Sequence, residues 1–218
     1  EQATAAKGEH ILVPLRHRNK LNLLKSLLEV YNPYLAIIFT NTKKMADEVA
    51  DGLIEKGMKV GRLHGDLPPR ERKKVMKQIN SLEFQYVVAT DLAARGIDIE
   101  GVSHVVNYEL PSDLDFYIHR VGRTARAGYS GIATTIYESA DEDAIVRLEK
   151  MGVTFVNMDL EKGEWVNIGE RNKRKARKKQ VNEIDKLAQS QVKKPKKVKP
   201  GYKKKMNQEM EKIKKRQK

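Results

Sequence analysis

The sequence predicts a three-layer α/β domain with a mostly parallel sheet, followed by a strongly basic C-terminal tail. Two observations lead to this expectation. Short runs rich in Ile and Val alternate with amphipathic stretches, which is typical of repeated βαβ units around a buried parallel sheet. The charge is also uneven, because residues 1–160 contain 21 basic and 22 acidic side chains, whereas residues 161–218 contain 22 basic and only 7 acidic ones. The first segment is long enough for one core, and the second has too few aliphatic residues for another.

The predicted strands are the short apolar runs of the first segment. Five runs are clear and two are weaker. The clear ones are Tyr34–Phe39, Val60–Leu63, Tyr86–Thr90, Val102–Asn107 and Ile132–Tyr137, and the weaker ones are His10–Val13 and Thr154–Asn157.

Five helices are predicted between these runs from apolar residues three or four positions apart. The first two are marked by Leu21, Leu24 and Leu28, and by Met45, Val49 and Leu53 with Gly57 as a C-terminal cap. The third begins after Pro69 and turns Val75, Met76 and Ile79 inward. The fourth has a capping box of Ser112 and Asp115 and runs to about Val121, and the fifth spans roughly Asp141–Met151.

The rest of the composition excludes several classes of protein. No apolar run approaches the roughly 20 residues of a membrane helix, and no signal peptide is visible at the N-terminus. The lack of cysteine excludes disulfides and thiolate metal sites, and fits a reducing cytoplasm. The chain begins with Glu1 and not with Met, so we expect a piece of a longer protein.

The expected organisation is a linker at 1–9, a domain at 10–169 and a strongly basic tail at 170–218. The tail is expected to be disordered or partly helical. Met206, Met210 and Ile213 have helical spacing, which suggests a helix that forms on a partner. A solvated charged tail is the alternative, and it is favoured for the free state.

Polar residues that follow the predicted strands are the first candidates for a site, since ligands of open parallel sheets bind at the carboxyl ends of the strands. Asn41 and Thr42 follow one strand, His64, Gly65 and Asp66 follow another, and Thr90 and Asp91 precede an ARGID segment that contains Gly96 and Asp98. Such groups can present oxygens and N–H groups to phosphate. Each one alone is also explained as an ordinary helix cap or turn.

The segment YIHRVGRTARAG, residues 117–128, carries the strongest signal. Arg120, Arg123 and Arg126 repel one another unless an anion lies between them, and the small residues around them leave room for a large ligand. A triphosphate fits, because the arginine fork matches phosphate oxygens. The alternative is that Arg120 pairs with an acid such as Asp115 or Asp98. The sequence has no P-loop, GxGxxG, HExxH or GxSxG motif, so the nucleotide would be presented by another domain.

Four blocks now define a resemblance: IIFTNTKK (37–44), LHGDLPPRER (63–72), VVATDLAARGIDI (87–99) and YIHRVGRTARAG (117–128). In this order they resemble the second RecA-like domain of DEAD-box RNA helicases, over about residues 10–169. The basic tail and GEW at 163–165 resemble the bacterial cold-shock members of that family.

The resemblance implies roles for individual residues. Arg123 and Arg126 would reach the γ-phosphate of ATP, with Arg126 or its partner as the arginine finger, and His119 would couple to the acidic motif of the other domain. Gly96 and Asp98 would lie at the ribose of ATP. ATP with Mg²⁺ would be held mainly by the missing N-terminal domain. The residues implied in contacts with the RNA backbone are Asn41, Thr42, Arg72 and Thr90. Pro69 departs from the family's usual Gln, which puts one backbone contact in doubt, and Ala125 stands where Gly is common.

The expected function is that of the C-terminal half of a cytoplasmic ATP-dependent RNA helicase, with no ATPase activity of its own and no membrane association. Its expected partners are single-stranded or duplex RNA, including ribosomal RNA, and the N-terminal RecA-like domain of the same protein. One alternative is a non-catalytic RNA-binding or ribosome-assembly module with a degenerate helicase domain. A DNA translocase with the same fold is another.

Overall fold

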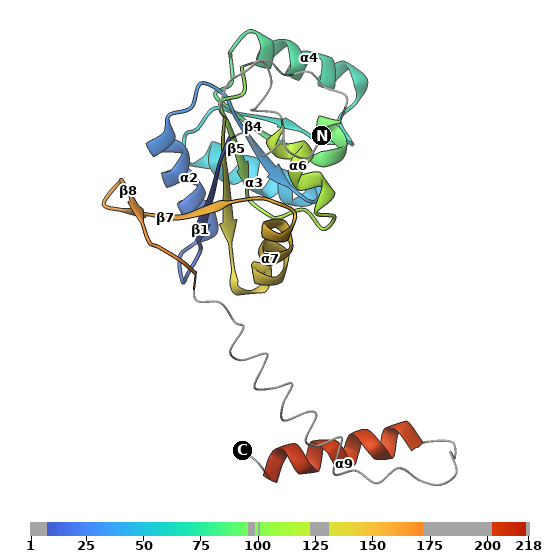
Figure 1. The fold of residues 1–218 in the computed structure, drawn as a ribbon. Helices are drawn as coiled ribbons and strands as arrows, with labels where there is room; N and C mark the ends of the chain where they lie inside the picture. Colours follow the sequence, from blue (N-terminus) through green and yellow to red (C-terminus); the bar gives the residue numbers. More distant parts are fainter. Residues whose placement is uncertain (1–7, 96–98, 100, 123–130, 172–201, 217–218) are drawn as a thin grey trace. The chain divides into compact units, whose positions relative to one another are not determined.

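A computed structural model describes residues 8–95, 99, 101–122, 131–171 and 202–216. The chain divides into two compact units, residues 1–170 and 171–218. The first unit contains the sheet and all the helices that cover it (Figure 1).

The sheet of the first unit is parallel except at one edge. Its strand order is β3-β4-β2-β5-β6-β1-β7-β8, and only β8 runs antiparallel to its neighbour. The strands are β1 (Gly8–Pro14), β2 (Ala36–Thr40), β3 (Val60–Leu63), β4 (Tyr86–Thr90), β5 (His104–Asn107), β6 (Gly131–Tyr137), β7 (Phe155–Glu161) and β8 (Glu164–Asn167). Every residue of β2 and β4 is buried, as expected for central parallel strands covered on both faces.

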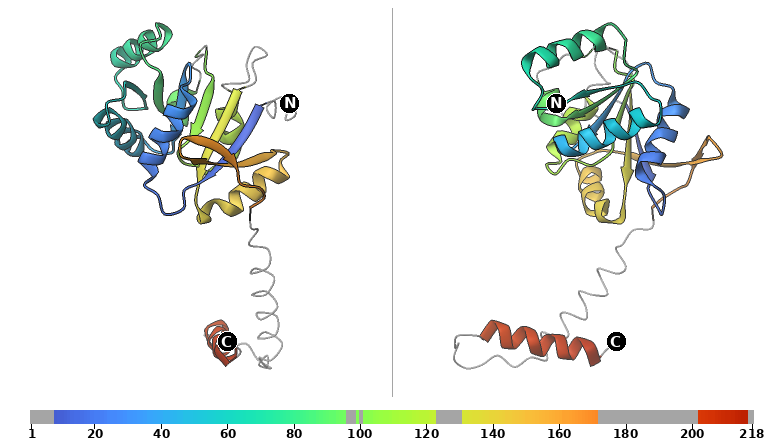
Figure 2. Two further views of the ribbon diagram at one scale, coloured as in Figure 1. Left: turned by 90° about the vertical axis from the view of Figure 1, so that its left-hand side faces the viewer. Right: turned by 180° about the vertical axis from the view of Figure 1, so that it is seen from behind.

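Helices cover both faces of the sheet, which makes the three-layer architecture that the sequence predicts. On one face lie α2 (Lys20–Tyr31) and α3 (Lys43–Glu55), which stand in front of the sheet when the molecule is seen from behind (Figure 2). The helices on the other face are α4 (Pro69–Asn80), the short α5 (Asp91–Ala94), α6 (Asp115–Val121) and α7 (Glu142–Lys150). A 3₁₀ turn, η2 (Ser139–Asp141), precedes α7.

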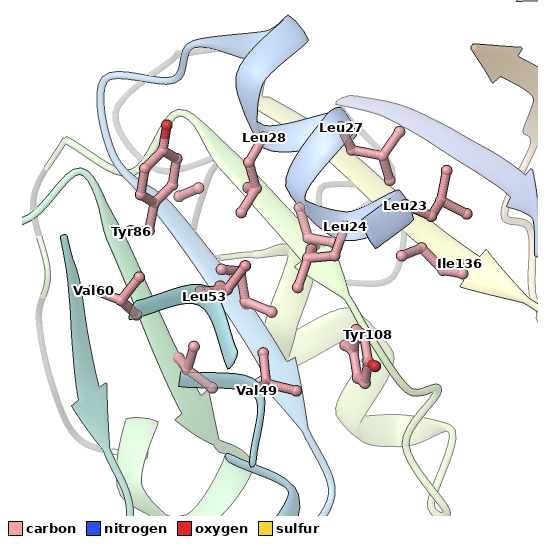
Figure 3. Close-up of a cluster of buried hydrophobic side chains, with 14 of the residues drawn as sticks. Leu23, Leu24, Leu27, Leu28, Val49, Leu53, Val60, Tyr86, Tyr108 and Ile136 are labelled. Carbon is pink, nitrogen blue, oxygen red and sulfur yellow. The ribbon is translucent and has the colours of Figure 1, made fainter. Parts of the chain in front are cut away.

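The largest core cluster joins α2 and α3 to the sheet. Leucines of α2 pack beside Val49 and Leu53 of α3 and beside Ile136 of β6 (Figure 3). These leucines recur every three or four residues, so one face of α2 is apolar and can be buried. The helix begins at the Asn19 cap, whose side chain accepts from the Asn22 N–H, and ends at Asn32 in the left-handed conformation.

Most of the predicted elements are confirmed. The five clear strands are present with ends shifted by at most two residues, and both weaker candidates are strands as well. Gly57 adopts the left-handed φ of 84° just past α3, as expected of a C-terminal cap glycine. The sequence did not predict β8, which is a short, half-exposed edge strand with little apolar pattern.

The predicted start of α6 is wrong. Its N-cap is Leu114, which makes no side-chain cap bond, and Ser112 does not form a capping box with Asp115. Instead, Asp113 Oδ1 accepts from the Asp115 N–H at 3.0 Å. The buried residues of α6 are Tyr117, Arg120 and Val121, while Leu114 and Ile118 are only partly buried.

In the second unit, α9 spans Tyr202–Arg216. This helix contains Met206, Met210 and Ile213, whose spacing suggested a helix. The prediction of a partly helical tail is therefore confirmed for Tyr202–Arg216. Across the described parts of both units, no helix combines the length and apolar character required to cross a membrane.

Candidate functional site

The candidate site lies at the edge of the sheet where the central strands end. Thr40 of β2 is in register with Thr90 of β4, and Phe39 is in register with Asn107 of β5. Parallel strands end on the same side, so the residues that follow β2, β4 and β5 come together although they are far apart in the sequence.

Arg120 of α6 is the centre of this edge. Its side chain is 1% exposed and forms a two-bond ion pair with Asp91, with Nε–Oδ1 at 2.6 Å and Nη2–Oδ2 at 2.7 Å. It also donates to Asn107 Oδ1 at 3.2 Å, to the Glu109 carbonyl at 2.6 Å and to Asn41 Oδ1 at 2.9 Å. A buried guanidinium needs such complete pairing, because the unpaired charge is costly to remove from water.

This network corrects the expectation that Arg120 belongs to a cluster of ligand-binding arginines. The alternative, that Arg120 pairs with an acid inside the protein, is confirmed, but the acid is Asp91 and not Asp115. All of the Arg120 bonds lie within the protein, so its role is to hold α6 against the ends of β2, β4 and β5.

Asn41 is also tied into the network. Its Nδ2 donates to the Leu110 carbonyl at 2.9 Å, its Oδ1 accepts from Arg120, and its N–H donates to Glu109 Oε1 at 3.1 Å. The side chain therefore fixes the loop after β2 to the loop after β5. The residue is nevertheless exposed, so its remaining surface is accessible at this edge.

Thr42 and Thr90 differ in what holds them. Thr42 is exposed and caps α3, since its Oγ1 accepts from the Met45 N–H at 3.1 Å. Thr90 is 7% exposed and stands in the N-cap position of α5 without a side-chain cap bond.

Arg72 of α4 is half-buried and joins two elements. Its Nη2 donates to the carbonyl of Ala93 at 2.8 Å. This bond fixes α4 to α5, the short helix that follows Thr90.

A cavity of about 200 Å³ opens beside the Arg120 network. His119 is exposed on its wall, and Arg95 lies over the ring of Phe116 with 5.6 Å between the guanidinium carbon and the ring centroid. The rings of Phe116 and His119 are 6.4 Å apart. The lining residues are Phe39, Asp91, Ala94, Arg95, Phe116, His119 and Arg120. The sequence analysis did not single out Arg95 or Phe116. The only signal in the sequence was the position of Phe116, an aromatic residue three positions before His119.

A second polar cluster lies at the end of β3. His64 is buried, and its Nε2 is 3.1 Å from Asp47 Oδ1, which also accepts from Arg62 at 2.9 Å. Burial raises the pKa of Asp47, but the hydrogen bond from Arg62 and the attraction of His64 and Arg62 outweigh it, so the pKa lies below its usual value. These contacts connect the LHGD segment to α3.

The remaining predicted site residues, Gly96, Asp98, Arg123 and Arg126, lie outside the described residues. The described edge thus brings Asn41, Thr42, Thr90 and His119 together around Arg120, and Arg72 joins it through α5. Among the described residues, no group of three or more His, Cys, Asp or Glu side chains is arranged to hold a metal ion.

Comparison with known proteins shows which class of protein has this fold and this arrangement of residues. Residues 19–128 match the helicase conserved C-terminal domain, so the chain belongs to this family. The chain is 68% identical over 217 residues to the DEAD-box ATP-dependent RNA helicase CshB of Bacillus subtilis, covering 100% of this chain and 50% of that protein. It is 60% identical over 217 residues to CshB of Bacillus cereus, covering 99% of this chain and again 50% of the relative. The chain therefore spans about half the length of the curated relatives it matches, and the half concerned is the C-terminal one.

Solved structures of DEAD-box proteins have the same fold. The E. coli protein SrmB, bound to regulator of ribonuclease activity A, matches with a TM-score of 0.63 and 32% identity, covering 71% of this chain and 90% of that one. The S. cerevisiae protein Dbp5 bound to RNA and ADP BeF3 matches with a TM-score of 0.65 and 29% identity, covering 71% of this chain and 42% of that one. The predicted three-layer RecA-like architecture is confirmed.

Proposed function

We propose that this chain is the C-terminal lobe of an ATP-dependent RNA helicase of the CshB type. Residues 10–169 form the lobe, and residues 170–218 form a basic RNA-binding tail. In the intact protein, ATP and RNA bind in a cleft between this lobe and an N-terminal RecA-like lobe. The alternation of closed and open states then separates a short duplex and releases RNA.

The observation that carries the proposal is the buried pair of Arg120 and Asp91. It holds α6 against the ends of three central strands, so His119 and the chain that leaves α6 start from a fixed position at this edge. A catalytic group must be held to within a fraction of an ångström, which favours such a rigid support. The relatives named above are ATP-dependent RNA helicases, and a neighbour of the same fold is bound to RNA and a nucleotide.

Roles for the site residues follow from the family resemblance. Arg123 and Arg126 contact the γ-phosphate, and Gly96 and Asp98 lie at the ribose. ATP with Mg²⁺ is held mainly by the N-terminal lobe, whose absence leaves this chain without ATPase activity. His119 contacts the acidic motif of that lobe from the wall of the cavity beside Arg120.

RNA contacts are proposed for Asn41, Thr42, Arg72 and Thr90. The side chains of Asn41, Thr42 and Arg72 each make an internal hydrogen bond, and Thr90 is buried, so the RNA backbone would meet a rigid surface. Backbone contacts hold the strand without reading bases, and binding should therefore be largely independent of sequence. The RNA is single-stranded or duplex, with ribosomal RNA as the proposed physiological class and the cytoplasm as the place of action.

The role of Arg126 can be tested in the full-length protein with Arg126→Lys. The lysine keeps the charge but lacks the fork, so we expect RNA-stimulated ATP turnover to fall on the order of a thousandfold. Arg147→Lys, an exposed position on α7, is the matched control and should leave turnover unchanged. Near-normal turnover of the Arg126 variant would remove that residue from the catalytic role. If the wild-type full-length protein bound RNA but lacked ATP turnover, the non-catalytic module would be the correct interpretation.

A further inference from the structure

The exposed face of α4 carries a row of four basic residues that the site described above does not use. Arg70, Lys73, Lys74 and Lys77 are all exposed and are spaced at i, i+3, i+4 and i+7, so they lie on one side of the helix. We call this row the α4 basic stripe. Figure 1 shows α4 on the outside of the domain, and both views of Figure 2 agree.

The stripe places four basic side chains on one helix face without an acidic partner among the described residues. None of the four forms an ion pair or a side-chain hydrogen bond with a described residue. Several basic residues elsewhere in the lobe do have acidic partners: Arg16 and Arg18 pair with Asp159, Lys25 with Glu29, Lys43 with Asp66, and Arg62 with Asp47 and Asp51. Like charges three or four positions apart repel one another along a helix, so this arrangement is relieved by an anion that spans the row.

The dimensions of the stripe favour a polyanion over a single anion. Neighbouring members have Cβ atoms about 5–6 Å apart. From first to last the row covers about 10 Å of helix axis, at a rise of about 1.5 Å per residue. A small anion meets one or two of these side chains, whereas the phosphates of a nucleic-acid backbone can meet all four.

The stripe is continuous with the edge proposed to contact RNA. Arg72 lies between Arg70 and Lys73 on α4, and it joins the helix to Ala93 through the 2.8 Å hydrogen bond. Thr90, at the end of β4, immediately precedes α5. Because α4 begins at the edge of the sheet where β3 ends, the stripe leads from that edge along the outside of the lobe.

We propose that the α4 basic stripe binds the phosphate backbone of RNA that extends beyond the cleft. This inference rests on the proposed function, and it adds a second binding surface outside the residues at the strand ends. The side chains are long and flexible, so the contacts are electrostatic and independent of base sequence.

The test uses the full-length protein with Arg70, Lys73, Lys74 and Lys77 all replaced by Gln, which keeps a good helix former at each position. The control replaces Lys56, Lys59, Arg147 and Lys150 by Gln, a set of four exposed basic residues with the same change of charge. RNA affinity is measured between 50 and 200 mM KCl for two probes. One is a single strand of about six nucleotides, and the other extends the same core to about twenty, beyond the site size of a typical single-strand groove.

For the long RNA, we expect the slope of log affinity against log salt to fall by about 3 in the stripe variant, because four phosphates contribute about 0.7 each. The wild type would then lose about 50-fold more affinity than the variant over this salt range. The control should retain the wild-type slope, and the short RNA should show a much smaller difference between the wild type and the stripe variant.

Two results would overturn the proposal. An unchanged slope for the stripe variant with long RNA, as expected if the stripe met an acidic protein surface, would remove RNA as its ligand. An equal fall in the control would show a general effect of net charge. Both outcomes can be distinguished from failure of the proposed function. In that case the wild-type protein would show no ATP turnover in response to the short RNA.

Discussion

At the scale of single residues, Arg120 shows how a charged side chain can be a structural element. Its five hydrogen bonds connect α6 to Asn41, Asp91 and Asn107, which belong to other parts of the chain, and to the Glu109 carbonyl. The arrangement is stable only when every partner is present, since a buried ion pair that loses one member leaves the other charge without compensation.

Arg120→Ala should therefore destabilise the chain by about 3 kcal/mol or more, the usual cost of breaking a buried pair. The substitution leaves the Asp91 carboxylate without its ion-pair partner and the side-chain oxygens of Asn41 and Asn107 without this donor. Urea unfolding of the chain measures the effect as a lower midpoint. Arg147→Ala serves as the control, because an exposed position on α7 should change stability by no more than about 0.5 kcal/mol. A loss below about 1 kcal/mol for Arg120→Ala would show that the network contributes little.

At the scale of elements, the start of α3 combines a structural and a proposed functional role in one residue. Thr42 caps the helix through the bond to the Met45 N–H, and the same residue is proposed to contact RNA. While the hydroxyl of an exposed N-cap threonine accepts from the helix, the backbone N–H and the methyl group of the same residue remain available to a ligand. The two roles can be separated because caps tolerate a carboxylate, whereas phosphate does not.

Thr42→Asp should keep the stability of the chain, since Asp is at least as good an N-cap as Thr and its charge suits the helix N-terminus. RNA affinity should fall at least about fivefold, because two like charges about 4 Å apart repel by about 1 kcal/mol even in water. Thr42→Ala is the companion variant, and it should lose about 1 kcal/mol of stability with the cap. Urea unfolding and RNA titration of the full-length protein separate these effects. Unchanged RNA affinity in Thr42→Asp would place the RNA backbone away from this cap.

At the scale of the whole molecule, charge and core are divided between the two units. The three hydrophobic clusters of the described residues lie within the first unit, whereas residues 171–218 contain 21 basic and only 4 acidic side chains. The folded lobe and the basic tail can therefore contribute separately to the proposed RNA binding.

Removal of residues 171–218 from the full-length protein should lower the salt dependence of RNA binding. Each phosphate that the tail neutralises adds about 0.7 to 0.9 to the slope of log affinity against log salt, so a tail that binds three phosphates accounts for about 2 of that slope. The unfolding midpoint of the lobe should change little, because the bond from Asn157 Nδ2 to the Gly169 carbonyl is retained. A tail in which the basic residues are replaced by Gln is the control for length. An unchanged slope after truncation would show that the tail takes no part in RNA binding.

The sequence by itself determined the fold class, most of the elements and the edge of the sheet proposed as the site. Buried parallel strands are continuous apolar runs and their covering helices are amphipathic, so both leave a local pattern in the sequence. Polar residues directly after those runs indicated the edge, because parallel strands end on the same side. Local pattern also indicated the helix in the tail, where α9 is found.

Tertiary structure alone decided which of these residues contact one another. The ion pair of Arg120 with Asp91, the stacking of Arg95 on Phe116 and the addition of β8 to the sheet edge depend on the relative positions of separate elements. The sequence offered Arg120 several acidic partners of equal chemical merit. The order of the strands selected one of them, because burial of the guanidinium requires a partner that reaches it in the packed interior.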